Sequence, residues 1–180
     1  MRAMVLYESM FGNTASVACA IAAGLRGEYE VDVRPVNGGP PAPPDTVEPD
    51  LLVVGAPTHA HGLPSGMSRK ALEGAAARRN AESDPLEYDA PGTMRRFVDH
   101  LPPGGGRRIA CFDTRFDRSP VLTGSAAKTM ARKLARRGYE VVGAPASFFV
   151  ADTEGPLIDG ELERAAAWGA ALACAMRPVG

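Results

Sequence analysis

The sequence has little of what marks disulfide-bonded or membrane proteins. Only three of the 180 residues are cysteine, and none of them forms a CxxC pair. Cys19, Cys111 and Cys174 each fall in an apolar segment, so we expect small buried thiols rather than disulfide or zinc partners. No apolar run approaches the length that spans a membrane, and the N-terminal run is too short for a signal peptide.

An excess of charge of one sign is also missing. The chain has 20 basic and 21 acidic side chains, which gives a formal net charge of -1. Such a balance creates no overall field that would attract nucleic acid. Because 45% of the residues are hydrophobic and 23% are charged, the composition is that of an ordinary globular protein. We therefore expect one cytoplasmic domain over residues 1–180 that binds neither nucleic acid nor membranes.

Three motifs of common α/β proteins are absent as well. The sequence contains no GxxxxGK[ST] for a polyphosphate, no GxGxxG for a dinucleotide and no GxSxG for a serine hydrolase. A phospho-acceptor site of receiver type needs paired acids after the first strand and a lysine after the last. Only Glu8 follows the first apolar run, and residues 147–155 contain no lysine.

Apolar runs and helical patterns alternate along the chain. Strands are expected at residues 3–7, 29–36, 50–57, 107–113 and 139–150. The continuous apolar run at 50–57 is typical of a parallel sheet covered on both faces, whereas the alternation at 29–36 indicates a strand near the edge. Helices are expected after most of these strands, including one over residues 93–100, one over 125–137 and one over 160–176. This alternation predicts a doubly wound parallel α/β fold. Such sheets bind ligands at the carboxyl ends of their strands.

The expected last helix places its larger apolar residues at helical spacing. We expect it to bury Leu162, Ala165, Trp168, Leu172 and Met176. The helix expected over 125–137 carries five cations, at positions 128, 132, 133, 136 and 137. They are interpreted as a solvated face, and a docking surface for an acidic partner is the alternative.

The loop after the first strand contains the most informative residues. Ser9 and Thr14 supply hydroxyl donors, Gly12 allows close backbone approach, and Asn13 tolerates tight-turn dihedral angles. A helix follows, so the loop amides stand at a helix N-terminus, where anions bind. The loop contains no lysine or arginine, which favours a phosphate monoester held by hydrogen bonds alone. The alternative is a plain helix start capped by Ser9 or Asn13.

The stretch Ser9-Met10-Phe11-Gly12-Asn13-Thr14 resembles the phosphate-binding loop of the flavodoxin family. The resemblance covers essentially the whole chain and implies a three-layer α/β sandwich, with a five-stranded parallel sheet of order 2-1-3-4-5 and helices on both faces. It also implies FMN as the cofactor. Phe11 stands where many members have Ser or Thr, so we expect its backbone amide to serve as the donor.

The resemblance implies two further loops that hold the flavin ring. The first is Pro57-Thr58-His59-Ala60-His61-Gly62, and the second is Asp113-Thr114-Arg115-Phe116. His59 and His61 stand where flavodoxins commonly place an aromatic ring, and they either contact the flavin or are solvated. Phe116 either stacks on the ring or packs in the core. Arg115 near the ring would stabilise the reduced, anionic flavin and raise its reduction potential.

Three functions remain open from the sequence. The first is an FMN-binding electron carrier that works with a reductase and an acceptor protein. The second is an NAD(P)H-dependent FMN quinone reductase, related to the tryptophan-repressor-binding-protein group, in which residues 78–92 form a lid or a subunit contact. The third is a flavodoxin-fold binding module without flavin. The oligomeric state is left open.

Overall fold

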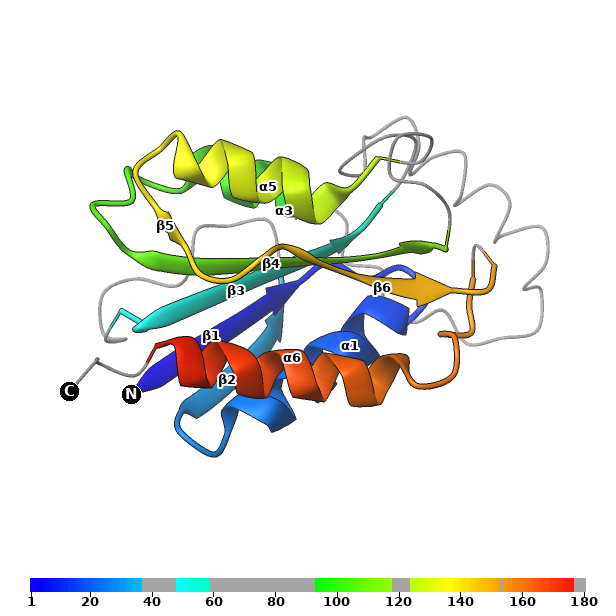
Figure 1. Cartoon of the computed structure of the whole chain (residues 1–180). Coiled ribbons are helices and arrows are strands. Elements are labelled where there is room, and N and C mark those ends of the chain that lie inside the picture. Colours follow the sequence, from blue (N-terminus) through cyan, green and yellow to red (C-terminus); the bar gives the residue numbers. More distant parts are fainter. Residues whose placement is uncertain (37–47, 59–92, 118–123, 153, 177–180) are drawn as a thin grey trace.

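The computed structural model describes residues 1–36, 48–58, 93–117, 124–152 and 154–176 (Figure 1). Its strands are β1 (Arg2–Tyr7), β2 (Glu30–Pro35), β3 (Leu51–Pro57), β4 (Arg108–Phe116), β5 (Glu140–Val141) and β6 (Ala146–Val150). Its helices are α1 (Asn13–Leu25), α3 (Met94–His100), α5 (Ala126–Ala135) and α6 (Glu161–Ala175). Residues 78–92, which the quinone-reductase alternative assigns to a lid or a subunit contact, lie outside the described residues.

The strands form one parallel sheet in the order β2-β1-β3-β4-β5, and β6 also pairs with β4. The predicted order 2-1-3-4-5 is therefore confirmed, with the fifth strand divided into two short pieces. β5 pairs with the start of β4 and β6 pairs with its end. Gly143 and Pro145 lie between the two pieces, and both residue types interrupt regular strands.

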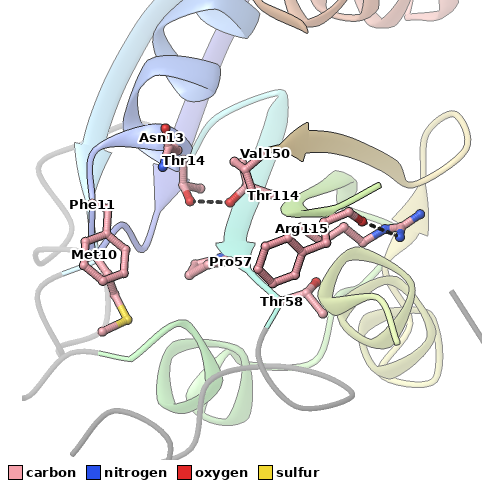
Figure 2. Close-up of a pocket in the computed structure, with 10 residues that line it drawn as sticks. Met10, Phe11, Asn13, Thr14, Pro57, Thr58, Thr114, Arg115 and Val150 are labelled. Carbon is pink, nitrogen blue, oxygen red and sulfur yellow. Dashed lines mark hydrogen bonds between the residues drawn. The ribbon is translucent and has the colours of Figure 1, made fainter. Parts of the chain in front are cut away.

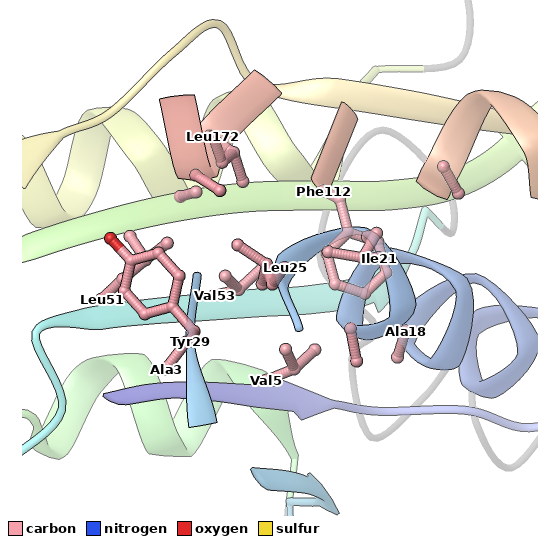
Figure 3. Packing of buried hydrophobic residues seen from close by; sticks show 14 of the residues in the cluster. Ala3, Val5, Ala18, Ile21, Leu25, Tyr29, Leu51, Val53, Phe112 and Leu172 are labelled. Atoms are coloured by element: carbon pink, nitrogen blue, oxygen red, sulfur yellow. The ribbon is translucent and has the colours of Figure 1, made fainter. Parts of the chain in front are cut away.

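Helices cover both faces of the sheet (Figure 1). α1 and α6 lie side by side on one face, and α3 and α5 lie on the other. The predicted three-layer arrangement is confirmed, since each face has its own apolar cluster. In the cluster under α1 and α6, Val5, Ile21 and Phe112 are fully buried (Figure 3). The facing cluster contains Met94 and Leu134 at its centre.

The outer edge of β6 is closed by backbone pairing with residues 156–158 at its end and by side chains of α6. The backbone N–H of Phe149 donates to the Glu161 carboxylate at 2.7 Å, and the Ser147 carbonyl accepts from Arg164. Arg164 also pairs with Glu161 and lies over the Phe148 ring, 4.6 Å from its centroid. The two charged side chains therefore occupy positions where the backbone of another strand would otherwise pair.

Two expectations about burial are wrong. Cys19 and Cys174 are exposed, and only Cys111 is buried as predicted. The two exposed cysteines lie on the solvent faces of α1 and α6, in runs of small apolar residues that do not distinguish the two sides of a helix. Leu162 is also exposed, at 42%. Ala165, Leu172 and Met176 are buried as predicted, and Trp168 is partly buried. Glu161 and Gly169 complete the buried side, because the helix turns small residues toward α1.

Within the described residues, no helix is long and apolar enough to cross a membrane. The helices expected over 93–100 and 125–137 are confirmed, and each begins at the predicted polar residue. The Thr93 side chain accepts from the backbone N–H of Arg96, and Ser125 accepts from that of Lys128. Both are N-cap hydrogen bonds that satisfy amides of the first helical turn.

Candidate functional site

The carboxyl ends of the central strands surround a hollow (Figure 2). Parallel strands all end at this edge of the sheet, so loops far apart in the sequence meet there. The hollow brings together residues from all three predicted loops and from the end of β6. The described residues that line it are Met10, Phe11, Asn13, Thr14, Pro57, Thr58, Thr114, Arg115, Phe116 and Val150.

The first loop turns at Gly12, which is the N-cap of α1 and has a φ of +84°. An L side chain is strained in this left-handed region, whereas glycine adopts it readily. Within the described residues, the backbone N–H groups of Gly12, Asn13 and Thr14 have no acceptor. Helix-start amides without partners favour an anion. The alternative in which Asn13 caps the helix is wrong, because Asn13 is its first residue.

Ser9 and Asn13 have structural contacts of their own. The Ser9 hydroxyl oxygen accepts from the backbone N–H of Ala15 at 3.4 Å, which leaves its own proton available. The Asn13 amide nitrogen donates to the carbonyl of Glu154 at 2.9 Å. A Cβ on Gly155 would lie 2.6–3.0 Å from the Asn13 amide group. Asn13 therefore fastens the first loop to the turn that follows β6.

Two buried hydroxyls join α1 to β4 inside the hollow. The Oγ1 atoms of Thr14 and Thr114 lie 2.8 Å apart, and the residues are only 2% and 4% exposed (Figure 2). Each hydroxyl has one proton and two acceptor lone pairs. One proton is used within the pair, so the other remains available to a ligand.

The second loop is described only as far as Thr58. Its backbone N–H donates to the Thr114 carbonyl at 2.8 Å, and its hydroxyl oxygen accepts from the backbone N–H of Ala126 at 2.9 Å. Thr58 therefore joins the ends of β3 and β4 to the start of α5. His59, Ala60, His61 and Gly62 lie outside the described residues, so their expected contact with the flavin remains a prediction.

Asp113 is fully buried, and its side chain stabilises α5 instead of lining the hollow. One carboxylate oxygen accepts from the Ser125 hydroxyl at 2.6 Å and from the backbone N–H of Ala127 at 2.9 Å. A carboxylate at the start of a helix is stabilised by the helix dipole. Asp113 therefore fixes the start of α5 beside the hollow.

Arg115 is only 7% exposed and lies beside Asp113, with 4.0 Å between Nε and the second carboxylate oxygen. One guanidinium nitrogen donates to the Phe116 carbonyl at 3.1 Å, and the group lies over the Phe149 ring. Figure 2 shows the guanidinium directed away from the Thr14 and Thr114 hydroxyls. Its charge is thus partly balanced by a buried carboxylate. Arg115 is the only cation among the described lining residues.

Phe116 is half-buried and lines the hollow, outside both apolar clusters. Of the two interpretations left open, the core position is therefore wrong. Val150 also lines the hollow, and the sequence interpretation missed it. Its position at the carboxyl end of a strand was the signal that could have identified it.

Cys111 lies on the same strand as Asp113 and is buried. Burial raises the pKa of the Cys111 thiol to about 12, and the Asp113 carboxylate adds to this effect. A thiol with such a pKa stays protonated at neutral pH. Cys111 is therefore a packing residue and no nucleophile.

No protein-family model matches the chain, and no curated protein matches it in sequence. Solved structures match over nearly its whole length. An archaeal flavodoxin is 19% identical with a TM-score of 0.62, covering 98% of this chain and 99% of its own. Flavodoxin 2 from Bacillus cereus is 17% identical with a TM-score of 0.61, covering 96% and 98%. A WrbA-like flavodoxin from Agrobacterium tumefaciens is 17% identical with a TM-score of 0.55, covering 98% and 97%.

These similarities define the class of the protein by its architecture. The chain has a flavodoxin-like fold, and its hollow lies at the carboxyl edge where this fold presents its loops. At identities of 14–19% the similarity shows the fold alone. What the hollow binds must be argued from its own residues.

Proposed function

We propose that the hollow binds FMN and that the protein is a redox flavoprotein that transfers electrons through the flavin. The observation that carries this proposal is the set of amides at Gly12, Asn13 and Thr14, which have no acceptor among the described residues, lie next to hydroxyl groups and belong to a loop without lysine. This donor set suits one phosphate monoester, because hydrogen bonds from amides and hydroxyls satisfy its oxygens. A di- or triphosphate would call for cations that the loop lacks.

The remaining lining residues fit a flat, mostly apolar ring. Met10, Phe11, Pro57, Phe116 and Val150 supply apolar surface around the polar groups. Sites for cofactors are typically apolar with a few well-placed polar groups. Flavin, when bound, supplies the one- and two-electron chemistry. The chain's own residues would bind the phosphate, exclude water from the ring and set its potential.

Arg115 is the residue that we expect to raise the reduction potential of the bound flavin. A buried cation close to the ring favours the anionic reduced state, and the neighbouring Asp113 reduces this effect without cancelling it. In a redox titration, Arg115→Glu should lower the potential and Arg115→Lys should leave it near that of the wild type. An unchanged potential in Arg115→Glu would contradict this role.

Comparison of FMN with riboflavin tests the cofactor assignment directly. Titration of the apoprotein, followed by quenching of flavin fluorescence, should give FMN a Kd at least about tenfold below that of riboflavin, because only FMN has a phosphate. Equal affinities would refute the phosphate site, and absence of binding to either would leave a binding module without flavin.

A further assay separates an electron carrier from a quinone reductase. The FMN-loaded protein is mixed with NADH or NADPH and a quinone, and the oxidation of the nicotinamide is followed at steady state. A carrier gives almost no turnover until a reductase is added. Rapid turnover by the protein alone would instead establish the quinone reductase.

A further inference from the structure

The face covered by α3 and α5 presents cations that take no part in the fold. Arg96, Lys128, Arg132 and Arg136 are exposed, and within the described residues none of them has an ion-pair partner. The only carboxylate on either helix belongs to Asp99, which pairs with Lys133. Four positive charges are therefore left without a neighbouring acid on these two helices.

The positions of these cations are unfavourable for the helices themselves. Arg96 and Lys128 occupy the third position of their helices, where their backbone N–H groups bond to the N-cap side chains of Thr93 and Ser125. Glutamate is preferred at this position, because it can bond back to the N-cap amide. A cation there also opposes the helix dipole.

The outer face of α5 adds repulsion between like charges. Lys128, Arg132 and Arg136 follow one another at four-residue spacing, which places them in a row on the exposed side of the helix. Like charges at this spacing destabilise a helix slightly. The helix dipole compensates for this at Arg132 and Arg136 near the C-terminus, but not at Lys128.

Both helices begin at the edge of the sheet that contains the hollow. The first amide of α5 donates to Thr58, which lines the hollow. The first amide of α3, on Met94, donates to the buried carboxylate of Glu8 at 2.8 Å, and Glu8 directly follows β1. Arg96 and Lys128, each two residues further along its helix, are therefore close to the edge at which the hollow opens.

The junction between the two helices is rigidly built. Lys133 pairs with Asp99, and the Arg137 guanidinium donates to the carbonyls of Val98, Asp99 and Leu101. These contacts fix α3 and α5 relative to each other. The backbone positions that bear the exposed cations are consequently fixed relative to each other, so binding a partner does not require the two helices to be ordered.

We propose that Arg96, Lys128, Arg132 and Arg136 form a docking surface, here called the α3–α5 surface, for the carboxylate-rich face of a partner protein. The partner's role as electron donor or acceptor rests on the proposed function; the docking itself does not. A protein is favoured over a membrane because, in the part of the chain that the structure describes, the exposed large apolar residues are Met1, Ile158 and Leu162, none of them on α3 or α5. It is favoured over nucleic acid because the chain as a whole has a net charge of -1 and lacks the excess of positive charge typical of proteins that bind a phosphate backbone.

The test uses charge reversal at the two unfavourable positions. The double variant Arg96→Glu/Lys128→Glu introduces the residue preferred at the third helical position, so its melting temperature should equal or exceed that of the wild type. Binding of the apoprotein to fluorescently labelled poly-L-glutamate is measured by anisotropy at low and at physiological ionic strength. The double variant should bind at least about fivefold more weakly and with a shallower salt dependence.

The matched control is Arg26→Glu. Arg26 is exposed at the C-terminal end of α1, on the opposite face and at the opposite edge of the sheet. Its reversal should leave binding to poly-L-glutamate within about twofold of the wild type. Parallel titrations use a DNA duplex and vesicles containing anionic phospholipid.

Three results would overturn the proposal. The first is an equal affinity of the double variant and the wild type for poly-L-glutamate. The second is a loss of affinity in Arg26→Glu as large as in the double variant. The third is an affinity for DNA or vesicles that exceeds the affinity for poly-L-glutamate and depends on Arg96 and Lys128. Because no flavin is present, failure to bind FMN leaves the docking result standing. Conversely, FMN binding without any binding of poly-L-glutamate would refute only the α3–α5 surface.

Discussion

Replacing Thr14 with valine removes one hydroxyl from the hollow while nearly preserving the shape of the side chain. In the structure this hydroxyl lies 2.8 Å from that of Thr114, and the buried pair has one proton left for a ligand. Thr14 belongs to the loop that we propose for phosphate binding. We therefore expect Thr114 to donate to Thr14 and Thr14 to donate to the phosphate of FMN.

The expected effect follows from the strength of a hydrogen bond to a charged group. Such a bond contributes about 1.5–3 kcal/mol, so Thr14→Val should weaken FMN binding by about tenfold to 150-fold. Riboflavin has no phosphate, and its affinity should change by less than about twofold. Thr114→Val should weaken FMN binding less than Thr14→Val does, because Thr14 keeps its own proton.

Stability of the apoprotein provides the internal check. Each single variant leaves one buried hydroxyl without its partner, which costs about 1–3 kcal/mol of the free energy of unfolding. The double variant Thr14→Val/Thr114→Val should lose less than the sum of the two, because both groups are then apolar. Urea unfolding of the four proteins and flavin titrations supply the data. If Thr114→Val weakened FMN binding more than Thr14→Val, then Thr114 rather than Thr14 would donate to the phosphate. If the variants weakened binding of FMN and riboflavin equally, the phosphate contact would be refuted.

Three further perturbations test the structure around the site. The pKa of the Cys111 thiol is 9.0 in the unfolded chain and about 12 in the folded one, so between these pH values only the unfolded chain loses the proton. The free energy of unfolding of the wild type should therefore fall relative to that of Cys111→Ala by about 1.4 kcal/mol per pH unit above pH 9.0. If urea unfolding gave the same difference in unfolding free energy between the two proteins from about pH 8 to about pH 10, this would be contradicted. Glu161→Ala leaves the edge N–H of Phe149 unpaired, so it should cost about 1–3 kcal/mol and increase self-association in light scattering, whereas Glu161→Gln keeps an acceptor and should show neither. Arg115→Met removes the cation beside buried Asp113 and should cost about 3–5 kcal/mol in chemical unfolding; a loss below about 1 kcal/mol would show that the pair is not coupled.

The positions of strands and helices could be predicted because periodicity and turn residues act locally, whereas the strand order was implied by the resemblance to the flavodoxin family. Thr93 and Ser125 were identifiable as helix starts, and the buried residues of α3 and α5 follow directly from their spacing. On α6 the predicted burial is confirmed for Ala165, Leu172 and Met176 and wrong for Leu162, because alanine and glycine rather than larger residues face α1. Alanine and glycine on both sides of a helix do not show which side is buried. The exposure of Leu162 and Cys174 therefore depends on the packing of α6 against α1, which the sequence does not reveal.

The candidate site could be predicted as a set of loops but not as a set of contacts. Hydroxyl, glycine and asparagine in one turn pointed to the phosphate loop, and the structure brings Thr14, Thr58 and Phe116 to one hollow. The tasks of Asp113 and Asn13 could not be predicted. One stabilises a helix start and the other fastens a distant turn, and both depend on tertiary contacts between segments far apart in sequence.

The contact between Asn13 and Glu154 joins residues 141 positions apart. During synthesis, the proposed phosphate loop therefore leaves the ribosome long before the turn that fastens it. Val150, which lines the same hollow, is also made late. A nascent chain lacking these residues has an incomplete hollow. On the proposed function, FMN would therefore load only after translation, and the flavin content of a preparation would measure how much of the protein has folded with its C-terminal part docked.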